Sequence, residues 1–358
     1  MFTQQIVNAI WLGSVYSLFA LGYTLVFGVL DILNLAHGAV FMWGAFFGLM
    51  AVTSFGLSIW SALLVAIIGA GILGVLVERL AFKPLRQLTL GNNILWAGFV
   101  LALFSFVALA SPTFTADAPG LALTIQVLFG IGLVVMVAGL VLDYLEVKPQ
   151  PPRSSPHLST LISSIGASTI LVSLAQASFG AQVSRFPAEV FAVKSLPLGA
   201  VRVTNLQLII LVIALVLMFA LTFMLKRTKA GRAMRSVAFS ERIASLLGVH
   251  VDRLIMQTFF LSSALAGAAG VLLGLALTSI SPFMGNNIAL KGLVVIVLGG
   301  LGNIQGAVLG GFLLALTEVL SVAYISSDFR DAIAFTVLFL VLLVKPTGLL
   351  GAATQKKA

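Results

Sequence analysis

The 358-residue chain lacks the residues that several kinds of functional site require. It contains no cysteine, which excludes disulfides and thiolate metal sites. Its three histidines, His37, His157 and His250, do not have the spacing of a metal-binding cluster. No Gly-Lys dipeptide occurs, so the chain has no Walker A loop. We therefore expect no cofactor and no metal, and any energy from ATP must come from a separate subunit.

Charge is also scarce. Only 9% of the residues are charged and 60% are hydrophobic, whereas a soluble domain has about 25% charged residues. A chain of this composition cannot hide its apolar surface from water by folding on itself, so we predict an all-α polytopic membrane protein. The net charge of +9 does not indicate nucleic acid, because the basic residues flank apolar runs. Residues 1–5 carry no positive charge, which favours a retained first helix over a signal peptide.

Long apolar runs predict about 10–11 membrane segments. A helix needs about 20 residues to cross a hydrocarbon core of about 30 Å. The run at 288–298 is too short, and it predicts a broken or re-entrant helix unless it extends back toward Pro282. The ten longer runs are 8–30, 35–53, 57–78, 93–111, 121–143, 159–180, 205–225, 254–280, 303–323 and 328–345.

The distribution of Lys and Arg predicts the orientation of the chain. When the basic loop 226–253 is placed in the cytoplasm, fifteen of the twenty Lys and Arg residues are cytoplasmic and four are external. This bias predicts an N-terminus outside and a C-terminus in the cytoplasm. Segment 78–86 would then close the third run as a basic anchor at the cytoplasmic interface. The Pro-rich stretch 148–156 predicts a non-helical cytoplasmic linker.

The basic, partly amphipathic segment 231–248 lies between two long apolar runs. A polar segment of this length must lie in water, and its Ala-Ser-Leu-Leu-Gly ending is typical of a helix followed by a turn. We interpret it as the element through which a separate ATPase moves a membrane pore. The residues expected to carry this coupling are Gly231, Arg232, Arg235, Glu241, Ala244, Ser245 and Gly248.

Polar residues inside apolar runs are candidates for a translocation path. Asn34 and His37 share a helix face, and they either form a hydrogen bond between helices or line the path. Lys291 and Glu318 are ionisable groups of the kind that usually faces a cavity within a membrane. They either line a pore or form an internal ion pair, or their side chains extend to the outer interface.

Glycine recurs every four residues at Gly302, Gly306 and Gly310. In lipid, small residues at this spacing let helices approach closely. Two interpretations follow, ordinary helix packing and a gating seam beside the pore. The spacing is not the GxGxxG pattern of a dinucleotide site.

Several stretches in order along the chain resemble one family. They are 20–28, 34–38, 78–86, 161–166, 231–248, 297–307 and 345–351. Together they resemble the LivH-like inner-membrane permeases of branched-chain amino acid ABC importers. The resemblance covers about 1–86 and 155–351 and rests on several independent motifs.

The stretch from about 87 to 153 departs from that family pattern. It holds two of the apolar runs, with an outer turn at 111–120, and both runs are apolar nearly all round. We predict a lipid-facing two-helix hairpin inserted into a single transmembrane permease domain, 1–351. Two added spans preserve the topology of everything that follows.

The resemblance implies an assembly in the bacterial inner membrane. It would contain two permease subunits, this chain with itself or with a paralogue, together with two cytoplasmic ABC ATPases and a periplasmic solute-binding protein. The solute would be a branched-chain or other neutral amino acid, and urea or short amides are alternatives within the family.

Two further hypotheses come from the residues. The chain could be an ion- or proton-coupled secondary transporter, although the inverted repeats and acidic relays of such carriers are not evident. It could also be a non-transporting membrane scaffold, against which the polar residues in apolar runs argue. An enzyme is not expected, because no nucleophile–base or metal constellation occurs.

Overall fold

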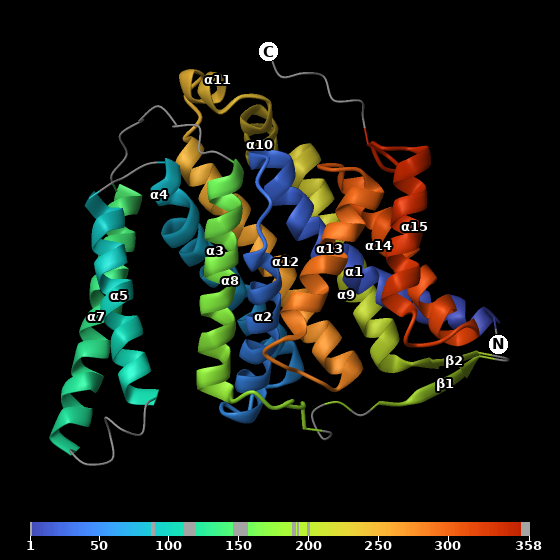
Figure 1. Ribbon diagram of the computed structural model, residues 1–358, viewed down its shortest axis with the longest axis horizontal. Coiled ribbons are helices and arrows are strands. Elements are labelled where there is room, and N and C mark those ends of the chain that lie inside the picture. Colours follow the sequence, from blue (N-terminus) through green and yellow to red (C-terminus); the bar gives the residue numbers. More distant parts are fainter. Residues whose placement is uncertain are drawn as a thin grey trace. The chain divides into compact units, whose positions relative to one another are not determined.

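The computed structural model describes residues 2–86, 90–110, 119–145, 157–187, 191, 193–198 and 201–351. These residues are mainly α-helical (Figure 1), and eight of the described helices are long and apolar enough to cross a membrane. The prediction of an all-α polytopic membrane protein is confirmed. The chain divides into a larger unit, Met1–Val75 with Ser164–Ala358, and a smaller unit, Leu76–Ser163.

Long apolar runs of the sequence form the helices of the larger unit, because a helix satisfies every backbone polar group internally in lipid. α3 continues into the smaller unit and α8 begins there. The helices are α1 (Phe2–Leu30), α2 (Ala36–Thr53), α3 (Ile59–Val77), α8 (His157–Phe179), α9 (Asn205–Arg227), α10 (Lys229–Phe239), α11 (Glu241–Leu246), α12 (Val251–Leu277), α13 (Met284–Gly299), α14 (Ile304–Tyr324) and α15 (Arg330–Val344).

Helices α1, α2 and α12 form the centre of the larger unit. Most of their residues are buried, whereas α8 and α9 expose large apolar side chains. The central helices approach closely because glycine stands at their contacts. A Cβ added to Gly22 would lie 2.6 Å from the Ser262 carbonyl oxygen, and one added to Gly44 would lie 2.9 Å from the Gly267 carbonyl oxygen. Small residues at such contacts are typical of helix packing in membranes.

The two ends of the larger unit have different connections (Figure 1). One end holds the two short helices α10 and α11, and we call it the α10–α11 end. The turn 300–303 is at the same end, and there the Asn303 side-chain amide donates to the Leu350 carbonyl at 2.7 Å. At the other end, strands β1 (Ser195–Leu198) and β2 (Val201–Thr204) pair antiparallel. Gln4 of α1 accepts from the Arg202 backbone N–H of β2 at 2.8 Å. We call this the β-hairpin end.

The short apolar run forms one continuous helix. α13 begins at Met284 and has 16 residues, so it extends back toward Pro282, which is the second alternative that the sequence leaves open. At 1.5 Å per residue it is about 24 Å long, less than a typical hydrocarbon core. The chain before it is non-helical from 279 to 283, and Ile280 forms an isolated bridge with Ser184.

The smaller unit contains a two-helix hairpin that covers the two apolar runs of the stretch 87–153. α5 (Leu90–Ala110) and α7 (Pro119–Leu145) pack against each other along their length. A Cβ added to Gly98 of α5 would lie 2.8 Å from the Gly132 carbonyl oxygen of α7, so glycine permits this close approach. The connection 111–118 and the predicted linker 148–156 lie outside the described residues.

Charged side chains are buried within the smaller unit, where α3 continues as the π-helix η1 (Glu78–Phe82) and the short α4 (Lys83–Arg86). The Arg79 guanidinium lies 2.8 Å from the Asp143 carboxylate of α7. Lys83 also pairs with Asp143, and Arg86 pairs with Glu78. An unpaired buried charge is costly, so each cation requires a partner. The expected basic anchor at the membrane interface is therefore an internal ion-pair network.

Candidate translocation cavity and coupling surface

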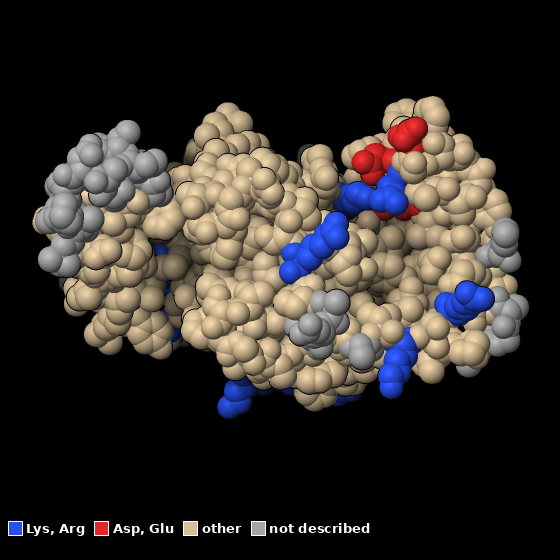
Figure 2. All heavy atoms as spheres, turned by 90° about the horizontal axis from the view of Figure 1, so that it is seen from below, with Lys and Arg blue, Asp and Glu red and all other residues tan. Residues whose placement is uncertain are grey.

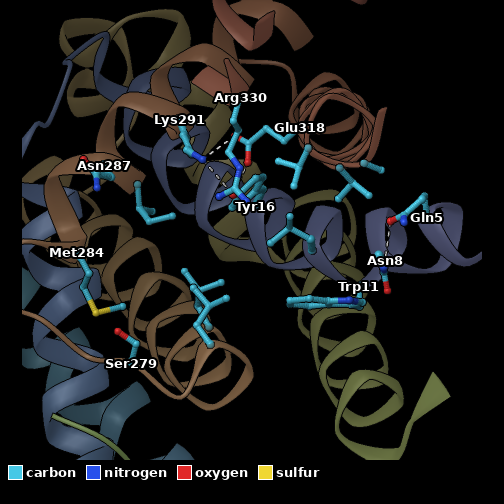
Figure 3. Close-up of a pocket in the computed structure, with 17 residues that line it drawn as sticks. Gln5, Asn8, Trp11, Tyr16, Ser279, Met284, Asn287, Lys291, Glu318 and Arg330 are labelled. Carbon is cyan, nitrogen blue, oxygen red and sulfur yellow. Dashed lines mark hydrogen bonds and ion pairs between the residues drawn. The ribbon is translucent and has the colours of Figure 1, made fainter. Parts of the chain in front are cut away.

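A cavity of about 530 Å³ lies at the β-hairpin end of the larger unit. Five helices contribute to its wall, namely α1, α12, α13, α14 and α15. Apolar side chains form much of the wall, and polar ones gather on it (Figure 3). The charged or hydroxyl-bearing side chains that the argument below uses are Tyr16, Lys291, Glu318 and Arg330.

Lys291 and Glu318 form an ion pair in this cavity. The Lys291 Nζ lies 2.6 Å from the Glu318 Oε1, and Glu318 is only 1% exposed. Tyr16 of α1 donates to the other carboxylate oxygen at 3.0 Å, and the Lys291 Nζ donates to the Tyr16 hydroxyl at 3.3 Å. Asp331 at the start of α15 adds a second carboxylate, 3.5 Å from the Lys291 Nζ. The structure thus brings two of the predicted path residues together.

The glycines predicted to pack or gate explain how these residues meet. Gly306 and Gly310 lie in α14, where a Cβ on Gly306 would lie 2.7 Å from the Gly299 carbonyl carbon of α13 and one on Gly310 would lie 2.5 Å from the Val295 carbonyl oxygen. The two helices therefore pack closely, and α13 places Lys291 beside Glu318 of α14. Gly302 lies in the turn before α14 with φ +76° and is not part of this contact surface.

Asn34 and His37 lie away from the residues that line the cavity. The Asn34 side-chain oxygen accepts from the Ala36 backbone N–H at 3.1 Å. The His37 Nε2 lies 3.2 Å from the Phe19 carbonyl oxygen, and its Nδ1 lies 3.4 Å from the Ser262 hydroxyl. The His37 contacts join α1, α2 and α12, which agrees with the helix–helix hydrogen bond that the sequence leaves open, whereas the Asn34 contact is local.

Sequence reasoning missed Tyr16, Arg330 and Asp331 as neighbours of the ion pair. Tyr16 looks like an ordinary aromatic residue within an apolar run, and the other two look like interface residues at a helix start. Figure 2 views the β-hairpin end and shows acidic and basic side chains beside one another on this face. The signal that could have identified Tyr16 is its hydroxyl group, since a buried tyrosine hydroxyl within an apolar run usually needs a hydrogen-bond partner.

The polar segment 231–248 forms two short helices at the opposite end (Figure 1). Thr228 caps α10 by accepting from the Gly231 backbone N–H at 3.1 Å, and Ser240 caps α11 by accepting from the Ile243 backbone N–H at 3.3 Å. Side-chain caps of this kind stabilise helix starts. Gly248 has φ +83° and ends the second helix in a tight turn, as the sequence predicts.

The predicted coupling residues divide into those that pack and those that face outward. Gly231 and Ala244 are buried, and the Arg235 guanidinium donates to the Leu225 carbonyl of α9. Ser245 donates to the Arg242 carbonyl at 2.8 Å. Arg232 is exposed, and Glu241 stands in the first turn of α11, where a carboxylate interacts favourably with the helix dipole.

Exposed apolar side chains are the feature of this segment that sequence reasoning missed. Phe239, Leu246 and Leu247 are 77%, 80% and 76% exposed. Phe239 and Leu247 line a hollow of about 450 Å³ together with Arg232 and Arg235. We call these apolar residues with the two arginines the coupling surface. Large apolar residues within a water-exposed segment were the available signal, because such patches mark interaction sites.

Eight described helices that are long and apolar enough to cross a membrane define a multi-pass membrane protein. The chain belongs to the family described as branched-chain amino acid transport system / permease component, whose model matches residues 5–342. It is therefore a transport component and not an enzyme.

Individual relatives agree with this family. The chain is 32% identical over 359 aligned residues to the high-affinity branched-chain amino acid transport system permease protein LivH of Escherichia coli strain K12, covering 99% of this chain and 97% of that protein. It is 29% identical over 367 residues to BraD of Pseudomonas aeruginosa, covering 99% and 98%. An autoinducer 2 import system permease protein, LsrC of Yersinia pestis, is 31% identical over only 137 residues, 36% of this chain. No solved structure matches the chain.

Proposed function

We propose that this chain is the membrane-spanning subunit of an ATP-driven importer of branched-chain or other neutral amino acids. One observation carries the proposal. A single helical unit has a charged cavity at one end and the coupling surface at the other, and the same central helices contact both. Tyr16 of α1 and Leu273 of α12 line the cavity, and α10 packs against α1 and α12.

This arrangement supports a mechanical connection between the two ends. An ATPase that moves α10 and α11 would move α1 and α12, since packed helices shift as rigid elements rather than deform continuously. The cavity would then open alternately to either side. Membership of the permease family supports partners of the usual kind: two cytoplasmic ABC ATPases, a second permease subunit and a periplasmic binding protein. With the coupling surface facing the cytoplasmic ATPases, the β-hairpin end and the N-terminus face the periplasm.

The test is purification of the tagged chain from its native membrane, followed by mass spectrometry of its partners and uptake by liposomes that contain the complex. We expect an ATPase and a binding protein to accompany the chain, and labelled leucine to enter only when ATP is available to the ATPase. Urea and acetamide are measured in parallel. Uptake by the chain alone, driven by an ion gradient, would instead support a secondary transporter.

The coupling surface has a matched test within the chain. Phe239→Ser removes an exposed apolar side chain from this surface, and Phe55→Ser removes one that is 67% exposed in the connection between α2 and α3. We expect Phe239→Ser to weaken ATPase recovery about tenfold or more, since buried aromatic residues at interfaces commonly contribute about 2 kcal/mol. Phe55→Ser should leave recovery unchanged. Equal recovery in both variants would contradict this role for Phe239.

A further inference from the structure

The ion pair of Lys291 and Glu318 stands in the wall of an open cavity and not in a closed protein core. Lys291 is 15% exposed, and both residues line the cavity with Arg330. Figure 3 shows Lys291, Glu318, Tyr16 and Arg330 converging on one part of it. Burying two charges costs desolvation free energy, so apolar residues would join α13 and α14 at least as well as an ion pair. A solute in the cavity can therefore approach the partly exposed Lys291 ammonium, and it reaches the Glu318 carboxylate, which is 1% exposed, when the two side chains separate.

The surrounding wall offers a complementary apolar surface. Leu273, Leu277 and Ile288 line the same cavity, whose volume lies within the range of about 300–1,000 Å³ typical of small-molecule sites. A small number of placed polar groups on a mainly apolar wall is the usual composition of such sites. A cation, an anion and an apolar wall together match a solute with both charges and an apolar side chain.

We propose that Lys291 and Glu318 form an exchangeable ion pair that binds zwitterionic solutes in transit. The solute carboxylate forms an ion pair with the Lys291 ammonium and interacts with the Arg330 guanidinium. The solute ammonium forms an ion pair with the Glu318 carboxylate, which keeps its hydrogen bond from the Tyr16 hydroxyl. Without solute the two side chains pair with each other. This inference rests on the proposed function and adds the residues that recognise the solute.

Charge balance explains why this site discriminates among solutes. Separating Lys291 from Glu318 leaves the buried Glu318 without its cation and leaves Lys291 with only the exposed Asp331 carboxylate, 3.5 Å away. Desolvated charges are costly when unpaired. A zwitterion supplies both partners at once. A carboxylate without an ammonium leaves Glu318 unpaired, and urea or acetamide supplies no charge. The site therefore selects zwitterionic amino acids over the neutral amides that the sequence leaves open.

Protection of an introduced cysteine tests the proposal, because the chain has no cysteine of its own. Ser279 lines the cavity and Ser54 is exposed in the connection between α2 and α3. Ser279→Cys and Ser54→Cys are made separately, and the purified permease–ATPase complex is alkylated with iodoacetamide. Leucine at ten times its Kd should slow labelling of the Ser279→Cys variant about tenfold, since only about one site in eleven is then free. Labelling at position 54 should not change.

Matched solutes and a matched variant decide the outcome. The compound 4-methylpentanoate has the leucine side chain and carboxylate without the ammonium, and neither it nor acetamide should protect position 279. The double variant Lys291→Met/Glu318→Gln keeps side-chain volume and leaves no buried carboxylate without its cation, because Asp331, the other neighbour of Lys291, is 66% exposed to water. It should therefore assemble normally and lose protection by leucine. Protection by all three solutes alike, or undiminished protection in the double variant, would overturn the proposal.

The same preparation separates this inference from the proposed function. ATP-driven uptake is measured on the Ser279→Cys complex before labelling. Uptake without protection by leucine at any concentration would reject the Lys291–Glu318 site and leave the importer assignment in place. Absence of ATP-driven uptake from the unmodified complex would reject the importer assignment itself.

Discussion

The Lys291 Nζ of α13 and the Glu318 Oε1 of α14 lie 2.6 Å apart at a cavity in the membrane-spanning bundle. These residues are far apart in the sequence, and the close packing of α13 on α14 at Gly299 and Gly306 brings them together. The carboxylate is held on its other side by Tyr16 of α1. Helices α1, α13 and α14 therefore meet at one charged cluster, which Asp331 of α15 also reaches.

The first prediction concerns the stability of this pair. Lys291→Met leaves the Glu318 carboxylate buried without its cation, and removal of one partner from a buried pair costs about 3–5 kcal/mol. Lys291 retains some exposure, so we expect a loss at the lower end of that range. The double variant Lys291→Met/Glu318→Gln should recover most of it. Thermal unfolding of the purified complex measures both, and a single variant as stable as the double one would contradict the prediction.

The second prediction concerns the turn that ends the coupling segment. Gly248 has φ +83° with open space around it, so Gly248→Val strains the backbone without a steric clash. Gly180 after α8 is a matched control, since it has φ +79° and equally open surroundings. Both variants should lose about 1–3 kcal/mol of local stability. Only Gly248→Val should abolish ATP-driven uptake, with membrane insertion retained in both. Equal uptake by the two variants would show that this turn does not contribute to coupling.

The third prediction concerns the contact between α13 and α14. A Cβ on Gly306 would lie 2.7 Å from the Gly299 carbonyl carbon, whereas a Cβ on Gly130 of α7 would meet nothing within 4 Å. Gly306→Ala should therefore cost about 1–3 kcal/mol through overpacking. Gly130→Ala should be neutral or stabilise by about 0.5–1 kcal/mol, because alanine favours a helix interior. Unfolding midpoints of the two variants that shift in the same direction would be inconsistent with this packing.

Sequence reasoning predicted the helices of this chain well, because an apolar segment in lipid must satisfy its backbone hydrogen bonds internally and therefore forms a helix. Each long apolar run corresponds to a described helix, and the polar segment between two of them forms α10 and α11. Lys291 and Glu318 were recognisable because ionisable groups are rare in membrane spans. Their pairing was one of the alternatives that the sequence left open, since the choice depends on which helices pack together and where glycine permits close approach.

Other features had weak or misleading signals. Asn34 and His37 are polar groups in an apolar run, the same signal as Lys291, yet both lie away from the cavity. Asn34 bonds locally to the Ala36 backbone, and His37 bonds between helices. Segment 78–86 has the composition of an interfacial anchor. Its Lys83 instead pairs with Asp143, which lies sixty residues later in the sequence. A local pattern cannot show such a partner, because charge pairing of this kind is decided by tertiary contacts.

The fourth prediction concerns this partner. Asp143 supplies a carboxylate to both Arg79 and Lys83 within the smaller unit. Asp143→Asn leaves those two cations with less counter-charge in a buried site, so we expect a loss of about 3 kcal/mol, within the range for breaking a buried pair. Asp328→Asn is the control, since Asp328 is exposed and its change should stay within about 0.5 kcal/mol.

Neutralising one cation should offset this loss if charge balance is its cause. The unmodified cluster has three cations (Arg79, Lys83, Arg86) and two carboxylates (Glu78, Asp143), a net charge of +1. The double variant Asp143→Asn/Lys83→Met removes one of each and keeps this net charge. A double-mutant cycle on unfolding free energies should therefore give a coupling of about 1–3 kcal/mol between positions 83 and 143. Additive losses would mean that Asp143 acts on this unit through packing of α7 and not through charge. Since the cavity and the coupling surface lie in the larger unit, uptake per folded molecule should be unchanged in either case.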